Sequence, residues 1–267
     1  MTLARPWHAY VGMEPSTVSK EGPDTVVWLD IGVLELTDNT LYPQSGTKCA
    51  AANSIDKLMM DRIRTYFMRI GLSNDEAEEL HTRYYRDYGL AIRGLIKHHT
   101  IDALDYDAQC DASLPLEDIL KPDPRLVALL ESLDRSRCRV FALTNAYKTH
   151  ATRVLKLVGL SHIVDAIIYC DYTNPDLYVP ADSSCKPEAE FYHAAAAAVG
   201  ATNAMNYFVD DSLKNVVAAQ QLGWRCVHFD ERAAHEPQQP PGARVPTIST
   251  MLDLHKVWPE LFISNSG

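Results

Sequence analysis

The sequence has no run of lysine and arginine residues that would mark a nucleic-acid-binding surface. Its 35 acidic residues outnumber the 25 basic ones, which gives a net charge of −10, and no basic cluster offsets this background. Such a balance argues against a general affinity for nucleic acid or anionic membranes, so we expect neither as a partner. Any anionic ligand must therefore be bound by local groups.

The sequence also lacks long apolar segments and paired cysteines. No stretch approaches the length needed to span a bilayer, and residues 1–21 lack the basic start and continuous apolar core of a secretory signal. The six cysteines are scattered, without the short paired spacings typical of zinc or redox motifs. We therefore expect reduced thiols, no membrane partner and a cytoplasmic protein, with or without access to the nucleus.

The chain does contain enough apolar material for a sizeable core, since 46% of its 267 residues are hydrophobic. Short apolar runs alternate with segments of helical periodicity. The runs are residues 26–29, 140–143, 166–170, 206–209 and 225–229. This alternation predicts an α/β fold with a doubly wound parallel sheet.

Residues 55–120 are predicted to be helical and to lie between the first and second strands. Helices are expected from residue 55, at residues 74–80 and at residues 84–98, and Ser73 with Glu76 forms a capping box before the second. A single crossover between parallel strands needs fewer residues. We therefore interpret residues 43–120 as an inserted helical cap domain.

The remaining segments form a core and two tails in this interpretation. The core consists of residues 25–42 and 121–235. Residues 1–24 form a loose N-terminal tail, and residues 236–267 form a proline-rich C-terminal tail in which residues 250–258 make a surface helix.

Three of the predicted strands end in polar side chains. Asp30 follows the first strand and Thr144 the second, while the strand at 206–209 ends at Asp210 and Asp211. Ligands of open α/β sheets bind outside the carboxyl ends of the strands, so these groups should converge on one pocket. Adjacent carboxylates repel each other unless a cation lies between them. The pattern therefore predicts a Mg²⁺ site and phosphate chemistry.

The order of five segments resembles the haloacid dehalogenase superfamily, and more closely its pyrimidine 5′-nucleotidase-like branch. The segments are residues 38–43, 84–94, 143–147, 185–187 and 210–215. The resemblance extends from about residue 25 to residue 230, and several motifs in family order are more specific than any one alone.

The resemblance implies a Mg²⁺-dependent phosphomonoesterase that works through an aspartyl-phosphate intermediate, with UMP or CMP as substrate. One aspartate attacks phosphorus, and a second acid two residues later protonates the leaving oxygen. The implied catalytic residues are Asp30, Asp38, Thr144 and Lys186, and the implied metal ligands are Asp30, Asp38, Asp210 and Asp211. Ser212 and Asn215 are expected to hold in place the loop that carries Asp210 and Asp211, which we call the acidic loop.

In this scheme Thr144 hydrogen-bonds a phosphoryl oxygen, and Lys186 neutralises charge on the transferring group. Outside the family order, Thr144 would be taken as the cap of a turn and Lys186 as a solvated lysine. Candidate substrate-binding residues are Asn145, Arg93 and Tyr147. The tyrosines at 84, 85 and 88 form a stripe that is more often core than a stacking face.

The first motif departs from the family pattern Asp-x-Asp-x-Thr, because residues 32–37 separate Asp30 from Asp38. In one register Asp30 is the nucleophile, residues 32–37 bulge outward and Asp38 is the acid. In the other, residues 33–36 replace the end of the strand and Asp38 is the nucleophile. We favour the first, because residues 26–29 make the better strand.

Two further stretches, residues 49–54 and 178–184, also look inserted. A third interpretation is that all three stretches reflect mis-assigned exon boundaries. Two alternatives for function follow from the same sequence. One is a phosphatase of another small phosphomonoester, such as a sugar phosphate or a lysophospholipid. The other is a protein that binds phosphate ligands but has lost turnover through the split motif.

Overall fold

The computed structural model describes residues 12–14, 19–31, 55–173, 184–231, 233 and 245–263. Its centre is a seven-stranded sheet with the order β1-β4-β3-β2-β5-β6-β7. The strands are β1 (Gly12–Glu14), β2 (Thr25–Leu29), β3 (Arg139–Thr144), β4 (Ala166–Tyr169), β5 (Met205–Asp210), β6 (Arg225–Phe229) and β7 (Thr247–Ile248). Neighbouring strands are parallel except for β1, which runs antiparallel to β4.

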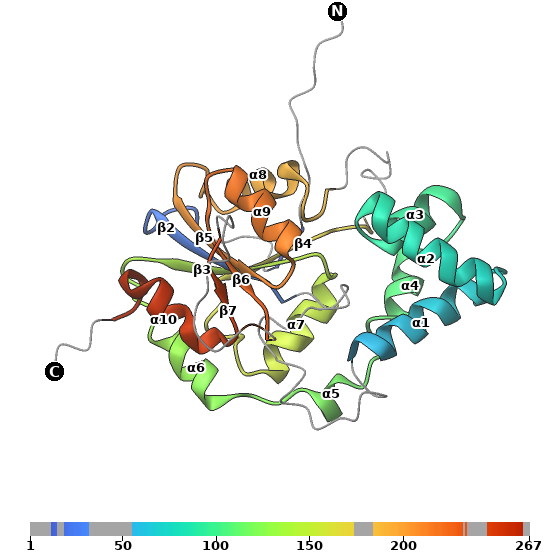
Figure 1. Ribbon diagram of the computed structural model, residues 1–267, viewed down its shortest axis with the longest axis horizontal. Coiled ribbons are helices and arrows are strands. Elements are labelled where there is room, and N and C mark those ends of the chain that lie inside the picture. The colour runs from blue at the N-terminus through green and yellow to red at the C-terminus, as the bar shows by residue number, and fades with distance from the viewer. Residues whose placement is uncertain are drawn as a thin grey trace, which may run out of the picture.

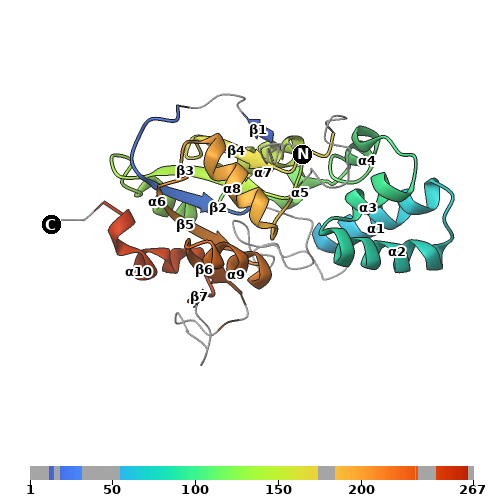
Figure 2. The same ribbon diagram turned by 90° about the horizontal axis from the view of Figure 1, so that it is seen from above.

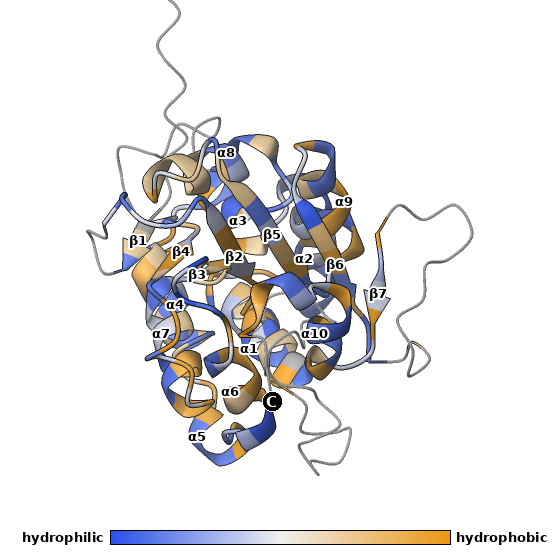
Figure 3. Ribbon diagram, turned by 90° about the vertical axis from the view of Figure 1, so that its left-hand side faces the viewer, coloured by the Kyte–Doolittle hydropathy of each residue, from blue (hydrophilic) through white to orange (hydrophobic). Residues whose placement is uncertain are grey.

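Strand β2 occupies the middle of the sheet because its apolar run can be buried on both faces. Val26, Val27, Trp28 and Leu29 are all buried. Figure 3 shows the hydrophobic residues along β2 and its neighbour β5, between the flanking helices. The carboxyl ends of β2, β3 and β5 therefore lie side by side at one edge of the sheet.

Helices cover both faces of the sheet, as the predicted doubly wound fold requires. Helices α8 (Ala189–Ala198) and α9 (Leu213–Gln221) lie on one face, and α6 (Pro124–Glu131), α7 (Lys148–Leu157) and α10 (Leu254–Val257) lie on the other (Figure 1). The α/β fold with a mainly parallel sheet is thus confirmed. Within the described part of the chain, no helix has the length and apolar character to cross a bilayer.

Four helices between β2 and β3 form a separate block, which we call the helical insert. They are α1 (Ile55–Arg69), α2 (Asn74–Tyr88), α3 (Ala91–His98) and α4 (Ala103–Gln109), and the short α5 (Leu116–Ile119) follows them. The insert lies beyond the end of the sheet towards which β2 points (Figure 2). The capping box of Ser73 and Glu76 is present at the start of α2, as predicted.

The predicted helix at residues 84–98 is two helices. Gly89 adopts a left-handed conformation, with φ of 76°, and ends α2, and α3 begins at Ala91. Glycine tolerates this conformation, which satisfies the last carbonyl groups of α2. Gly94 then allows α3 to approach α2, because a Cβ atom at this position would lie 2.2 Å from the Tyr84 ring.

Both predicted tails contain ordered elements that pack on the core. The strand Gly12–Glu14 pairs with β4, so the interpretation of residues 1–24 as loose is wrong for these three residues. Near the other end, Trp258 and Leu261 are buried, and the Trp258 ring packs edge-on against Tyr207 at 5.1 Å. The expected surface helix is only α10 with short 3-10 turns on either side, because its apolar side chains are drawn into the core.

Candidate active site

Three aspartates from two strand ends meet at the carboxyl edge of the sheet. Asp30 directly follows β2, where its N–H donates to the carbonyl of Val209 at 3.1 Å. Asp210 ends β5, and Asp211 follows it. One carboxylate oxygen from each of Asp30, Asp210 and Asp211 lies within 4.8 Å of the others, and all three side chains are buried. The structure thus brings together three of the predicted metal ligands.

The Asp210 carboxylate is held in place by the start of α9. The Ser212 N–H donates to Oδ1 at 2.7 Å, and Nδ2 of Asn215 lies 3.2 Å from both oxygens. Ser212 and Asn215 therefore hold the acidic loop, as expected. Burial raises the pKa of Asp210 to about 7, with a further increase from the neighbouring Asp30, while Lys186 opposes this increase. A positive charge close to this carboxyl group favours its ionised form.

Lys186 supplies such a charge. Its Nζ lies 2.7 Å from Oδ2 of Asp210 and also forms an ion pair with Asp30. The main chain of Lys186 is fixed by Asn145, whose Nδ2 donates to the Lys186 carbonyl at 3.0 Å and whose Oδ1 accepts from the Lys186 N–H at 2.8 Å. The described contacts of the Asn145 amide are therefore with Lys186, where the sequence suggested a substrate contact.

Thr144 lies at the end of β3 and is fully buried. Its Oγ1 accepts from the Ala146 N–H at 3.0 Å, so the hydroxyl caps the turn that follows the strand. A hydroxyl that accepts through a lone pair retains its proton for donation. The turn-capping role and the predicted contact with a phosphoryl oxygen are therefore compatible.

Two other candidate substrate-binding side chains have partners within the protein. Tyr147 packs against the rings of Tyr169 and Tyr172, and its hydroxyl lies 3.1 Å from Oγ1 of Thr173. Arg93 on α3 reaches the core, where Nη1 lies 2.6 Å from Oε1 of Glu188. Asp38 and residues 32–37 lie outside the described residues, as do residues 49–54 and 178–183.

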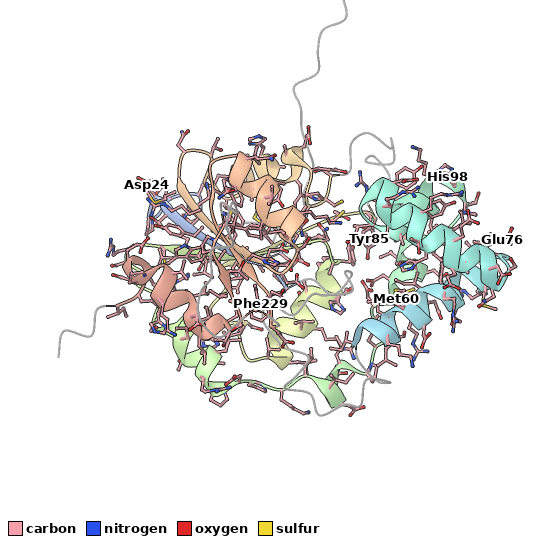
Figure 4. The ribbon with its side chains drawn as sticks, viewed as in Figure 1. Asp24, Met60, Glu76, Tyr85, His98 and Phe229 are labelled. Atoms are coloured by element: carbon pink, nitrogen blue, oxygen red, sulfur yellow. The ribbon has the colours of Figure 1, made fainter. Side chains whose placement is uncertain are left out.

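The tyrosine stripe divides between two environments. Tyr84 is buried, and its hydroxyl lies 2.9 Å from Nε2 of His99. Tyr88 makes the same kind of contact with His98, at 2.7 Å. By contrast, Tyr85 lies on the side of the insert that faces the core (Figure 4), and its hydroxyl accepts from Nζ of Lys214 at 3.0 Å.

Glu188 and Lys214 were not identified from the sequence, although both contact the insert. Glu188 lies two residues after Lys186, and Lys214 lies three after Asp211. The only signal was that Glu188 lies just after the 185–187 segment and that Lys214 lies within the 210–215 segment. A charged residue near a motif is usually solvated, so this signal does not identify a partner across the fold.

The acidic cluster fits a small divalent cation. All of its donor atoms are carboxylate oxygens, which are the ligands that hard cations such as Mg²⁺ prefer. Asp30, Asp210 and Asp211 are the residues that could hold the ion. Within the described residues, no other group of three or more acidic, histidine or cysteine side chains has ligand atoms as close together as these.

A protein-family match covers more than half of the chain. Residues 37–223 match the family described as haloacid dehalogenase-like hydrolase. The match begins one residue before Asp38 and therefore excludes the strand that carries Asp30. It extends through the insert and the segments that carry Thr144, Lys186 and the acidic loop.

Two curated relatives are named for phosphate metabolism or phosphatase activity. Phosphate metabolism protein 8 of Saccharomyces cerevisiae is 35% identical over 209 residues, which is 75% of this chain and 62% of the relative. Sesquiterpene phosphatase astK of Aspergillus oryzae is 27% identical over 115 residues, which is 43% of this chain and 54% of the relative. The chain thus spans less than two thirds of the length of either protein.

Among solved structures, the magnesium-bound HAD hydrolase YfnB from Bacillus subtilis shares the fold. The two align with a TM-score of 0.52 and 14% sequence identity, over 90% of this chain and 100% of that one.

Proposed function

Because the chain belongs to the haloacid dehalogenase-like hydrolase family, we propose that it is a phosphomonoesterase and that pyrimidine nucleoside 5′-monophosphates are its substrates. The observation that carries the proposal is the buried cluster of Asp30, Asp210 and Lys186 at the carboxyl edge of the sheet. Carboxylates held beside a lysine suit the transfer of an anionic phosphoryl group. The names of the two curated relatives support a phosphorylated substrate.

In the proposed reaction an oxygen of the Asp30 carboxylate attacks the phosphorus atom. The bond from phosphorus to the leaving oxygen breaks, and that oxygen takes a proton from Asp38 in the favoured register. Water then attacks the phosphorus of the aspartyl phosphate and gives a proton to Asp38. The bond between phosphorus and the Asp30 oxygen breaks, so inorganic phosphate is released and the Asp30 carboxylate is restored. The position of Asp30 at the end of the central strand, beside Asp210, supports this register.

Lys186 and Thr144 would stabilise charge on the phosphoryl oxygens during transfer. The lysine is nearly fully buried, where a cation interacts more strongly with an anion than it does in water. The Thr144 hydroxyl can donate to one of the same oxygens. When bound to Asp30, Asp210 and Asp211, Mg²⁺ would supply Lewis-acid neutralisation of the phosphate charge.

The substrate class rests on the resemblance to pyrimidine 5′-nucleotidases. A sugar phosphate or a lysophospholipid is the alternative among phosphomonoesters. A second candidate function is binding of phosphate ligands without turnover. The observation that favours it is the separation of Asp30 from Asp38 by residues 32–37, because a displacement of about 1 Å can lower a rate 10²-fold.

The test is phosphate release from UMP, CMP, glucose 6-phosphate and lysophosphatidic acid, with Mg²⁺ and with EDTA. A matched variant lacks residues 32–37. We expect Mg²⁺-dependent release from the nucleotides by the chain as written. Release by the shortened variant alone would favour the binding protein. If neither the chain as written nor the shortened variant released phosphate from any of the four substrates, the assignment as a phosphatase would be overturned.

A further inference from the structure

The helical insert contacts the turn that carries Lys186. This turn comprises residues 185–188, and Arg93 reaches it from α3. Nη1 of Arg93 lies 2.6 Å from Oε1 of Glu188 and 3.0 Å from Sγ of Cys185. Arg93 therefore bonds to a residue on each side of Lys186. We call the contact between Arg93 and Glu188 the Arg93–Glu188 bridge.

Glu188 also ties the turn together. Its Oε2 accepts from the Cys185 N–H at 3.2 Å, and its own N–H donates to the Cys185 carbonyl at 2.8 Å. The same carboxylate thus joins the start of the turn to α3. A displacement of α3 would act on Cys185, directly before Lys186, and on Glu188, two residues after it.

The insert approaches this turn closely at a second point. Gly89 lies between α2 and α3, and a Cβ atom there would be 2.8 Å from Sγ of Cys185. The Cys185 side chain is fully buried. Arg93 also donates to the Tyr88 carbonyl, which fixes the turn between the two helices.

A third contact joins the insert to the start of α9, the helix that follows Asp210 and Asp211. Nζ of Lys214, at the start of α9, lies 4.5 Å from the centre of the Tyr85 ring and 3.0 Å from its hydroxyl. The insert therefore contacts the two segments that present Lys186 and Asp210, so its position is coupled to both.

We propose that Arg93 and Glu188 are positioning residues, which hold Lys186 against Asp30 and Asp210 when the insert is seated on the core. The inference rests on the proposed phosphatase function and assigns Arg93 a role other than substrate binding. The Arg93 side chain is 12% exposed and pairs with Glu188, so its guanidinium is directed at the core. Seating of the insert thus completes the electrostatic environment of the phosphoryl group.

The kinetic test compares Arg93→Gln, Glu188→Gln and the double variant. We expect each single change to lower kcat about tenfold to 100-fold and to change KM less than about threefold, because a positioning defect affects the chemical step. The double variant should be no slower than the slower single variant, because both single changes already break the same Arg93–Glu188 bridge. Arg93→Lys keeps the charge and should recover part of the rate.

The opposite pattern would identify Arg93 as a substrate-binding residue. In that case Arg93→Gln raises KM at unchanged kcat, and Glu188→Gln leaves both constants unchanged. Additive losses in the double variant would also contradict the proposal, because the two side chains would then act separately.

A matched glycine pair tests the same contact without removing a charge. Gly89 and Gly71 both have left-handed backbones, with φ of 76° and 102°, but a Cβ atom at Gly71 would meet nothing within 4 Å among the described residues. Gly89→Ala is expected to lower kcat, whereas Gly71→Ala shares the backbone strain and should not. Equal kcat in the two variants would contradict the proposal.

Alkylation of Cys185 by N-ethylmaleimide gives a readout that does not need activity. We expect Glu188→Gln to accelerate this reaction at least about tenfold, as local opening of the contact exposes the thiol. Cys138 and Cys226, which are also buried, serve as internal controls and should be unchanged. If Glu188→Gln left the alkylation rate of Cys185 unchanged, the proposed positioning role of the Arg93–Glu188 bridge would be contradicted, even if the wild-type chain released no phosphate. Wild-type inactivity alone would overturn only the proposed function.

Discussion

Lys186 and Asp210 form an ion pair at the carboxyl edge of the sheet, with 2.7 Å between Nζ and Oδ2. The two side chains are 2% and 0% exposed. A buried ion pair is weak evidence for stability, because both groups lose their hydration. The same arrangement suits a site that must attract and hold a phosphate group.

Replacement of Lys186 by methionine keeps most of the side-chain volume and removes the charge. We expect phosphate release to fall by about 10² to 10³-fold, the range measured when one preorganised donor to a developing anion is removed. The measurement is kcat and KM for UMP. Lys121→Met is the control, because Lys121 contacts only the nearby Glu117 carbonyl among its described hydrogen-bond partners. An equal loss in both variants would contradict the role of Lys186.

Mg²⁺ should stabilise the folded chain, because the acidic cluster exists only in the native structure. At a free Mg²⁺ concentration of 100 times Kd, the expected gain in unfolding free energy is about 2.7 kcal/mol. Thermal unfolding at increasing MgCl₂ concentrations measures this gain. Asp210→Asn should reduce the shift in Tm, whereas Asp253→Asn, at a buried position outside the cluster, should retain it. The same Mg²⁺-induced shift in wild type and Asp210→Asn would argue against the proposed ligands.

The buried carboxyl group of Asp111, in the turn after α4, is expected to lower the stability of the folded chain as the pH rises. Burial raises its pKa to about 8 from 3.8, with a further increase from Asp107. The folded state therefore binds the proton more tightly than the unfolded state, so the stabilisation present below pH 4 is lost as the pH rises to 8. In urea unfolding, Asp111→Asn should gain stability relative to wild type from pH 5 to pH 8. A constant difference would refute this.

The buried imidazole of His150, on α7, is expected to change the stability with pH in the opposite direction, so it serves as a control. Burial lowers its pKa from 6.5 to about 4, and Arg153 contributes to the shift. Its neutral form is favoured by folding, so this stabilisation is present above pH 6.5 and is lost as the pH falls to 4. His150→Gln should therefore gain stability relative to wild type on acidification, in the same titration.

The sheet could be predicted from the sequence because its strands are buried on both faces and appear as continuous apolar runs. The observed β2, β3 and β5 each differ from the predicted runs by no more than one residue at either end. Strand β1 was missed because its three residues show no alternation, and its pairing with β4 depends on tertiary contact. The break in the 84–98 helix depends on the left-handed Gly89.

The position of the acidic cluster could also be predicted, because parallel strands deliver their carboxyl ends to one edge. The partners of Asn145 and Arg93 could not. Asn145 bonds to a residue 41 positions away, and Arg93 bonds to one 95 positions away. Such pairs arise from how the insert and the turns meet, and no local pattern encodes them.

The most direct test is to locate the covalent phosphate. The chain is incubated with UMP and Mg²⁺, quenched and reduced with borohydride, which converts an aspartyl phosphate to homoserine, and the modified residue is identified by peptide mass spectrometry. We predict modification at Asp30 and its loss in Asp30→Asn. Modification at Asp38 would contradict the favoured register. Phosphate release without modification at either residue would contradict the aspartyl-phosphate mechanism itself.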